Sequence, residues 1–464
     1  MVRLSRVAQL VALVPLVSCA VPDTDGARGA SIEPDARPDV LLILVDDLGR
    51  HDLGGEGHAW HSTPHLDRLR ESSVRFDEAY TNAPNCAPSR AALMSGRFGI
   101  RTGIHTVASP AQGPEELRAV VPPVNRRDLD DAERTLAESL RDAGYRTGFV
   151  GKWHLGEDPT TQGFDRNVAG SRAGHPRRYS PPYENDTLAD GPADEYLIDR
   201  LGAETRALIE DFEAQPDGRP WFVMYAPYAV HTPLQAPAER IEALRARHPE
   251  LSLRAVKYAV MVESADAAIG RVLEAVDPER TVVAFASDNG GLQPITDNAP
   301  LRGGKGMLYE GGIATPLYLR VPHVAPRTVR TPVQVFDLHP TLLELCGVEP
   351  TPALDAVSLL PALDRPEFDR GPIFWHFPAY LRGNDDESRE PDLPFRTTPA
   401  GVIRDGRWKL IEWFDDGGLE LYDLDADPGE LTDLSESAIE IRDTLAAELM
   451  RWQVGTGAQI PTPR

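Results

Sequence analysis

Cysteine is scarce in this sequence, since its 464 residues include only Cys19, Cys86 and Cys346. Three cysteines cannot form a disulfide framework. Apolar residues make up 41% of the chain and charged residues 26%, which is the composition of a water-soluble globular protein with a large hydrophobic core. This composition excludes long disorder, a collagen helix and a coiled coil.

Long hydrophobic runs are absent beyond the N-terminus, which excludes a protein that crosses a membrane several times. Basic residues are too few to balance the acidic ones: 48 against 72 gives a formal net charge of −24. Such a charge argues against a protein that wraps nucleic acid. If the substrate is an anion, the positive charge that binds it must be local and enclosed in a pocket.

The N-terminus has the pattern of a secretory signal. Arg3 and Arg6 are followed by an apolar stretch, residues 7–17, that is too short to span a bilayer and contains Pro15. We therefore predict a lipoprotein-type signal peptide over residues 1–18.

The end of that segment, Leu16-Val17-Ser18-Cys19, resembles a bacterial lipobox. The resemblance implies cleavage before Cys19 and lipidation of its thiol, with plain secretion as the alternative. Residues 19–37 are rich in Pro, Asp, Gly and Ala and are predicted to be a flexible tether. We expect an exported lipoprotein, in the bacterial periplasm or on the outer membrane or cell surface, that meets the membrane only through its lipid anchor.

An uninterrupted apolar run at residues 40–45 predicts a strand buried on both faces of a sheet. Further strands are predicted at residues 145–150, 221–225, 281–286 and 316–321. Thr135-Leu136-Ala137-Glu138 is a capping box that opens a helix ending near Gly144, and residues 253–276 have helical spacing. This alternation predicts an α/β fold with a large, mostly parallel or mixed sheet between helices.

After about residue 365 the pattern changes. Short strands are predicted at residues 400–403, 408–413 and 419–423, and a helix at residues 439–453. The expected organisation is a large domain over residues 38–365 and a smaller α+β subdomain over residues 366–464, with an antiparallel sheet and one packed helix.

Polar clusters follow four of the predicted strands, at the place where ligands bind in sheets of this kind. They are Asp46-Asp47-Leu48-Gly49, Gly151-Lys152-Trp153-His154, the segment up to His231, and Ser287-Asp288-Asn289. Ordinary turns explain one such cluster, but four clusters make that interpretation weak.

The carboxylates of these clusters indicate a metal site. Asp46 and Asp47 would repel each other strongly unless a cation lay between them. Asp288 and Asn289 offer further oxygen ligands, which suit Ca²⁺ or Mg²⁺, and no cysteine–histidine spacing typical of zinc accompanies them. Taken singly, each pair is better explained by a helix cap or a turn.

Cys86-Ala87-Pro88-Ser89-Arg90 opens a predicted helix over residues 91–94. A nucleophile at this place lies near the positive end of the helix dipole, and Arg90 adds positive charge. A structural thiol is the alternative, and the polar surroundings count against it. Cys346, in contrast, follows an apolar stretch and is predicted to be a buried thiol at the end of a helix.

Residues 86–90, with Leu93-Met94-Ser95-Gly96-Arg97 after them, resemble the maturation signature C-x-P-S-R of the type I sulfatases, whose cysteine is oxidised to formylglycine. Other motifs stand in the order typical of that family: Asp46-Asp47-Leu48-Gly49, Gly151-Lys152-Trp153-His154-Leu155-Gly156, His231-Thr232-Pro233, Ser287-Asp288-Asn289-Gly290-Gly291, Lys305 with Glu310-Gly311-Gly312, Trp408-Lys409-Leu410 and Leu421-Tyr422-Asp423-Leu424. The resemblance covers residues 38 to 455 and implies the fold of the alkaline phosphatase superfamily.

For the catalytic site, the resemblance implies one Ca²⁺ per chain, bound by Asp46, Asp47, Asp288, Asn289 and the modified Cys86. The formylglycine aldehyde is hydrated to a diol, and one hydroxyl attacks sulfur and displaces the alcohol. The second hydroxyl then loses its proton, which re-forms the aldehyde and expels sulfate. A thiol could not release sulfate by this route, so a maturation enzyme that generates formylglycine is an expected partner.

The same resemblance and the chemistry of the side chains imply the remaining roles. Arg90 would hold the formylglycine oxygens, and Lys152 and Lys305 would bind sulfate. His231 could protonate the departing oxygen, and His154 could orient the diol or take its proton. The sequence leaves the division between the two histidines open.

Two features concern the substrate. His376, in Phe374-Trp375-His376-Phe377-Pro378, lies in a segment that often approaches substrate in bacterial carbohydrate sulfatases, and an aromatic core patch explains it equally well. Arg177-Arg178-Tyr179 is either a subsite loop or a solvated turn.

Ala87 departs from the family pattern, which commonly has Ser or Thr at this position.

We therefore expect a sulfatase that hydrolyses a sulfate ester through a formylglycine-sulfate intermediate on calcium. A sulfated carbohydrate is the favoured substrate, and another sulfate ester is the alternative. Two other functions are kept open: a phosphodiesterase or phosphonate monoester hydrolase on the same scaffold, and a non-catalytic lipoprotein that binds sulfated glycans.

Overall fold

The structure is a computed structural model that describes residues 37–464, except residues 352, 366, 384–388 and 390–391. The predicted signal peptide of residues 1–18, the lipid site Cys19 and the tether as far as residue 36 lie outside the described residues. Within the described part, no helix is both long and apolar enough to cross a membrane.

An eight-stranded mixed sheet lies at the centre, in the order β10-β2-β9-β8-β1-β7-β5-β6. Its strands are β1 (Asp39–Val45), β2 (Val74–Phe76), β5 (Arg146–Gly151), β6 (Arg166–Val168), β7 (Trp221–Ala226), β8 (Thr281–Ser287), β9 (Leu317–Arg320) and β10 (Arg327–Val329). β1 pairs in parallel with β7 and β8, and β5 pairs in parallel with β6 and β7. β9 runs antiparallel to β2 and β8, which makes the sheet mixed. The five strands expected from apolar runs all belong to this sheet.

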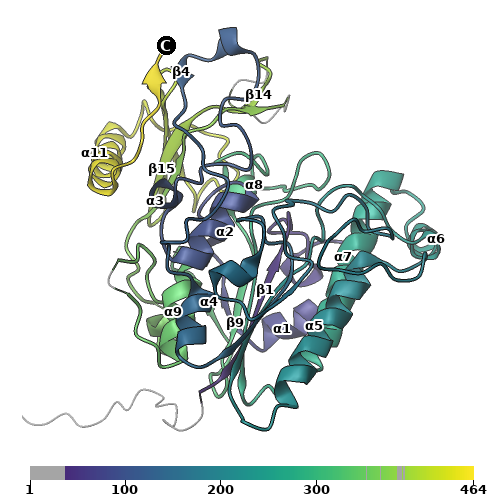
Figure 1. Ribbon diagram of the computed structural model, residues 1–464. Coiled ribbons are helices and arrows are strands. Elements are labelled where there is room, and N and C mark those ends of the chain that lie inside the picture. The colour runs from purple at the N-terminus through teal and green to yellow at the C-terminus, as the bar shows by residue number, and fades with distance from the viewer. Residues whose placement is uncertain (1–36, 352, 366, 384–388, 390–391) are drawn as a thin grey trace, which may run out of the picture. The chain divides into compact units, whose positions relative to one another are not determined.

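Helices cover both faces of the sheet (Figure 1). On one face lie α1 (Pro64–Glu71), α5 (Leu197–Glu213) and α7 (Leu253–Leu273), and on the other lie α2 (Cys86–Ser95), α4 (Leu136–Asp142) and α9 (Leu338–Leu345). Alternate residues of β1 enter two separate cores: Val40, Leu42 and Leu44 face α2, α4 and α9, whereas Leu41, Ile43 and Val45 face α1, α5 and α7. This explains why the run at residues 40–45 is apolar without alternation.

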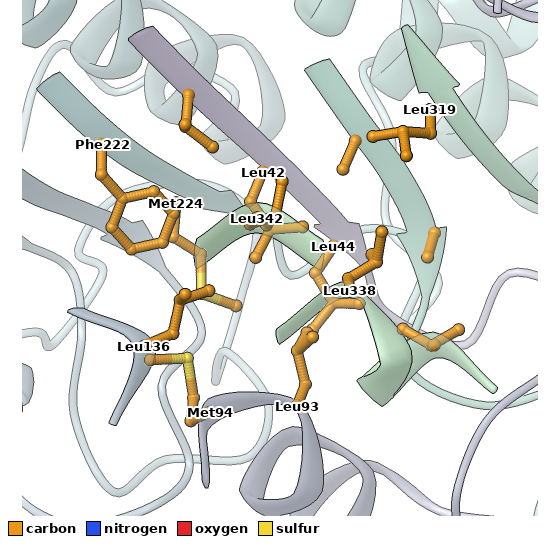
Figure 2. Packing of buried hydrophobic residues seen from close by; sticks show 14 of the residues in the cluster. Leu42, Leu44, Leu93, Met94, Leu136, Phe222, Met224, Leu319, Leu338 and Leu342 are labelled. Carbon is orange, nitrogen blue, oxygen red and sulfur yellow. The ribbon is translucent and has the colours of Figure 1, made fainter. Parts of the chain in front are cut away.

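The first of these cores shows how the helices are fixed on the sheet. Figure 2 shows Leu42 and Leu44 of β1 beside Leu338 and Leu342 of α9, with Met94 of α2 in the same cluster. α4 begins with the predicted capping box, in which Thr135 and Glu138 bond to each other's backbone N–H. α9 ends at Cys346, which is buried as expected.

The C-terminal region carries the expected antiparallel sheet. It consists of β12 (Ile373–Phe377), β15 (Ala400–Asp405), β16 (Trp408–Trp413) and β17 (Leu419–Asp423), and α11 (Ile439–Thr456) packs on it. The residues from Arg37 to Arg464 pack as one unit. The division into domains near residue 365 stays a prediction.

The remaining elements are short. They are α3 (Gly99–Thr102), α6 (Ala238–Arg247), α8 (Glu310–Ile313), α10 (Leu360–Asp364), β3 (Ala79–Tyr80), β4 (Val120–Val121), β11 (Val333–Gln334), β13 (Leu381–Arg382), β14 (Phe395–Thr397), β18 (Thr462–Pro463), and single 3₁₀ turns at Gly54–Glu56, Glu115–Leu117, Pro159–Gln162 and Val335–Asp337.

A buried ion cluster joins the antiparallel sheet to the start of α8. The Lys409 side chain is 0% exposed, and its Nζ lies 2.9 Å from Glu310 Oε1 and 2.7 Å from Glu430 Oε1. Glu310 also accepts a hydrogen bond from the Tyr80 hydroxyl at 2.7 Å. Burial raises the pKa of Glu430 to about 7 although Lys409 opposes the shift, so the lysine is needed to keep both carboxylates charged.

Replacing Lys409 by Met should therefore lower the free energy of unfolding by about 3–5 kcal/mol, because two buried carboxylates lose their only ammonium partner in this cluster. Chemical denaturation followed by circular dichroism would measure the loss. Lys257→Met on α7 is the matched control and should change stability by no more than about 0.5 kcal/mol. Equal losses in the two variants would contradict the role given to the cluster.

Candidate active site

The polar clusters expected after the strands meet at one edge of the sheet. β1, β5, β7 and β8 are parallel, so their carboxyl ends coincide. Backbone hydrogen bonds hold these ends together: Asp46 N–H donates to Ala229 O at 2.9 Å, Asp288 N–H to Val45 O at 3.1 Å, and Lys152 N–H to Ala226 O at 2.7 Å. The edge of the sheet thereby brings together the aspartates, Lys152 and the segment that leads to His231.

Cys86 enters this site from α2, of which it is the first residue. Its side chain is buried, and its Sγ lies 3.4 Å from His154 Nδ1. Burial raises the pKa of the Cys86 thiol, and the nearby Lys152 and Lys305 do not overcome this effect. The sequence had suggested that the helix dipole and Arg90 would activate the thiol, but desolvation dominates, so the unmodified thiol stays neutral.

Arg90 and Lys152 bridge the acidic groups in the interior. Arg90 Nε donates to Asp288 Oδ2 at 2.7 Å, and its Nη1 donates to Lys152 O at 2.5 Å. Lys152 Nζ lies 2.8 Å from both Asp46 oxygens and 3.9 Å from Asp288 Oδ2. Burial is the largest single effect and opposes the charge of Lys152, but Asp46, Cys86 and Asp288 together outweigh it and raise the pKa of the ammonium group.

Asp47 is held by a second set of partners in the same cluster. Lys305 Nζ lies 2.5 Å from Asp47 Oδ1, and Asn289 Nδ2 donates to that oxygen at 2.9 Å. His231 Nε2 lies 3.6 Å from Asp47 Oδ2. Burial alone would raise the pKa of Asp47, but the neighbouring cations, Lys305 foremost, outweigh burial and lower it.

Glycines allow the Lys305 loop to approach its neighbours closely. A Cβ on Gly304 would lie 2.6 Å from Gly291 O, and Gly303 and Gly306 have φ values of 71° and 92°. Two side-chain-bearing residues of the site, Asp47 and His154, also have left-handed backbone conformations, with φ of 61° and 64°. Each costs about 1 kcal/mol, and such strain is typically retained where a side chain must be held for function.

The oxygen atoms of the site fit a hard divalent cation. Ligand atoms of Asp46, Cys86 and Asp288 all lie within 4.8 Å of one another. Asp47 Oδ2 and Asn289 Oδ1 are buried and have no hydrogen-bond partner among the described residues. Burial first, then the neighbouring Asp288 and Asp47, raise the pKa of Asp46 well above its usual range, as expected where carboxylates converge. This set of donors suits Ca²⁺.

The two histidines contact different members of the cluster. His154 contacts Cys86, whereas His231 contacts Asp47. Burial, with the neighbouring cations, lowers the pKa of His154 to about 2, and burial lowers that of His231 to about 3 although Asp47 opposes it. Both imidazoles are therefore neutral in this arrangement.

His376 lies apart from these groups in its described contacts. It is on β12, its Nε2 lies 3.1 Å from Gln459 O, and its ring packs near Phe414 and His105. A small cavity of about 10 Å³ beside it is lined by His376, Phe98 and Trp452, among others. These contacts fit the interpretation of His376 as part of an aromatic core patch better than its interpretation as a substrate-binding residue.

Asp52 is a site residue that the sequence analysis missed. Its carboxylate accepts hydrogen bonds from Gly49 N–H at 2.6 Å, from the Tyr258 hydroxyl at 2.5 Å, and from the Thr296 hydroxyl. It therefore ties the turn after β1 to α7 and to the loop that leads to Lys305. Its position in the sequence, as a third aspartate three residues after Gly49, could have identified it.

The family model described as Sulfatase matches residues 38–348. The chain belongs to the sulfatase family. A second model, described as N-sulphoglucosamine sulphohydrolase, C-terminal, matches residues 304–454 of this sulfatase. The predicted membership of the type I sulfatases, in the alkaline phosphatase superfamily, is thereby confirmed, and the protein is a sulfuric ester hydrolase.

Relatives of this sulfatase include a sulfatase from Formosa agariphila, 29% identical over 92% of this chain and 90% of that protein. Arylsulfatase A from Homo sapiens is 30% identical, covering 87% of this chain and 84% of its own. N-acetylgalactosamine-6-sulfatase from Sus scrofa is 32% identical over 75% of this chain and 69% of its own.

Solved structures share the fold of this sulfatase. The crystal structure of Ps i-CgsB in complex with k-i-k-neocarrahexaose has a TM-score of 0.74 and 27% identity, covering 90% of this chain and 92% of that chain. The phosphonate monoester hydrolase of Agrobacterium radiobacter has a TM-score of 0.65 and 22% identity, covering 92% and 100%, which shows a shared fold alone.

Proposed function

We propose that this sulfatase hydrolyses a carbohydrate sulfate ester to an alcohol and inorganic sulfate, with formylglycine made from Cys86 and one Ca²⁺. The observation that carries the proposal is the position of Cys86, at the buried start of α2, between His154 and the converging carboxylates. The neutral thiol is a poor nucleophile there, which supports its conversion into an oxygen-bearing group.

Asp46, Asp47, Asp288 and Asn289, with the oxygen of modified residue 86, would hold the calcium. When bound, the ion would neutralise the carboxylates and offset the charge of the sulfate oxygens. The hydrated formylglycine side chain supplies an oxygen nucleophile and, through its second hydroxyl, a way to release sulfate.

The chain's own residues position these groups. Arg90 Nη2 has no hydrogen-bond partner among the described residues, so it is free to hold the oxygens of residue 86. Lys152, paired with Asp46, and Lys305, paired with Asp47, would bind the sulfate oxygens. His154, which contacts residue 86, would orient its hydroxyls or take a proton from them. His231, which lies beside Asp47, would donate a proton to the departing alcohol oxygen, for which the bound anionic ester must favour its protonated form. This division of roles between the two histidines stays a prediction.

The comparisons support a carbohydrate as the alcohol. Relatives that cover most of this chain are named N-acetylgalactosamine-6-sulfatases, and the Ps i-CgsB structure holds a neocarrahexaose. Likeness to the phosphonate monoester hydrolase concerns the fold alone, so no observation favours that activity over sulfate hydrolysis. Export as a lipoprotein anchored through Cys19 stays a prediction, which membrane fractionation of a Cys19→Ala variant would test.

Mass spectrometry of the tryptic peptide over residues 76–90 tests the proposal directly. In protein from a host that makes formylglycine, the peptide is expected with an aldehyde in place of the Cys86 thiol, because sulfur is replaced by oxygen and two hydrogens are lost. The peptide that contains Cys346 serves as the internal control and should keep its thiol. Fully active protein with an intact Cys86 thiol would overturn the proposal.

A further inference from the structure

The segment over residues 169–179, between β6 and α5, lies against both candidate histidines. His154 N–H donates to Ser171 O at 3.0 Å, and a Cβ on Gly174 would lie only 2.5 Å from His154 Cε1. The ring of His175 stacks on that of His231, with 5.7 Å between centroids and 12° between planes. This segment therefore forms part of the wall around the site.

Both ends of the segment are fixed by buried tyrosines. The Tyr228 hydroxyl donates to Ala169 O at 3.1 Å. The Tyr179 hydroxyl lies 2.7 Å from the carbonyl oxygens of both Tyr228 and His231, and Tyr179 N–H donates to Gln235 Oε1 at 2.9 Å. The backbone between these anchors is thus held in place before any substrate binds.

The exposed side chains of this segment are basic in a chain whose net charge is −24. The side chains of Arg177 and Arg178 are 74% and 44% exposed. They share one carboxylate: Arg177 Nη1 lies 2.5 Å from Glu184 Oε2, and Arg178 Nη2 lies 4.0 Å from Glu184 Oε1. One carboxylate cannot neutralise two guanidinium groups, and exposed pairs of this kind are weak, so positive charge is left for a ligand.

The accessible side of the site points toward this segment. Asp46 and Lys152 are fully covered, whereas the side chains of His231 and Lys305 keep 14% and 13% of their surface exposed. A sulfate ester must therefore enter past His231 and Lys305, and the alcohol part stays on that side. His175 of the basic segment stacks on His231, so the alcohol part of the substrate would lie next to this segment.

We propose that His175, Arg177 and Arg178 form a subsite for a second anionic group, a sulfate or a carboxylate, on the same carbohydrate. Polyanionic oligosaccharides would then be the preferred substrate class. This inference rests on the proposed function, because it assumes that the sulfur of the substrate lies in the cluster of Lys152 and Lys305. Of the two interpretations of Arg177-Arg178-Tyr179, a subsite loop or a solvated turn, this inference favours the subsite loop.

The test compares kcat/KM for the monosulfated and disulfated forms of one disaccharide. The wild-type protein should prefer the disulfated form, and Arg178→Met should lower the ratio of the two values about tenfold, as expected for the loss of one ionic hydrogen bond. The wild-type preference should also shrink at high salt, because the arginines are exposed. Arg206→Met on α5, whose side chain is also 44% exposed, is the matched control and should leave the ratio unchanged.

The outcomes separate this inference from the proposed function. Hydrolysis of both disaccharides with no preference, or with a ratio that Arg178→Met does not lower, overturns the subsite and leaves the proposed function standing. An equal fall in the Arg206→Met control also overturns the subsite, because it would show a general effect of charge. Hydrolysis of an aryl sulfate but of neither disaccharide removes the carbohydrate assignment, and the subsite falls with it.

Discussion

Replacing Cys86 by Ala is expected to abolish turnover, with a loss of at least about 10⁴-fold in kcat, because loss of a covalent nucleophile removes the reaction path itself. The fold should survive. Alanine is the best helix former, α2 begins at this residue, and the described side-chain contact that is lost is the one between Sγ and His154 Nδ1. We expect unfolding free energy to change by about 1 kcal/mol, measured by denaturation alongside turnover of a sulfate ester.

The second buried cysteine provides the matched control. Cys346 lies at the end of α9, in the core between helix and sheet, far along the chain from the motif. Cys346→Ala should lower stability through lost packing and leave kcat unchanged. A Cys86→Ala protein that turns over at the normal rate would reject the nucleophile, and loss of activity in both variants would point to an effect of stability.

The long strands of the sheet were predictable because each carries enough apolar residues to be buried on both faces. β1, β5, β7, β8 and β9 were found this way. β2, β6 and β10 have only three residues each, which is too short for any periodicity, and they exist because distant segments pair with them. In the C-terminal sheet, β15, β16 and β17 were predictable because glycine marks the turns between them, whereas β12 was not predicted as a strand.

The site was predictable where polar residues follow parallel strands, because topology alone brings strand ends together. Burial was not predictable, and burial sets the direction of the pKa shifts of Cys86 and His376. His175 carries no sequence signal of its own, since only the path of the loop brings its ring onto His231.

Lysine content was an unused signal. The chain has only four lysines among its 48 basic residues, and three of them, Lys152, Lys305 and Lys409, pair with buried carboxylates. Nearly all basic residues of this chain are arginines, so each lysine indicates a position where a compact point charge suits the site better than a guanidinium group. The rarity of lysine beside abundant arginine could have identified Lys152 and Lys305 as sulfate-binding candidates and Lys409 as part of the ion cluster at α8.

Removal of divalent cations is expected to lower kcat/KM by at least about 100-fold, and added Ca²⁺ should restore it. The reason is the charge balance of the site. Counted by formal charge, Asp46, Asp47 and Asp288 contribute three negative charges and Arg90, Lys152 and Lys305 three positive ones, so the protein alone offers no formal net positive charge to an anionic ester. A bound divalent cation supplies it.

The measurement combines turnover after dialysis against a chelator with the effect of Ca²⁺ on the thermal midpoint, which rises when an ion binds only the folded state. Asp47→Asn should lose most of this rise, because it removes the charge next to the unpartnered Asn289 oxygen. Asp266→Asn is the matched control: this buried carboxylate on α7 accepts hydrogen bonds from the backbone of His65 and Leu66, and its loss should lower stability without changing the response to Ca²⁺. Full activity in metal-free protein, with no rise in the thermal midpoint on adding Ca²⁺, would rule out the ion at this site. The role of Cys86 would still be decided by the Cys86→Ala experiment.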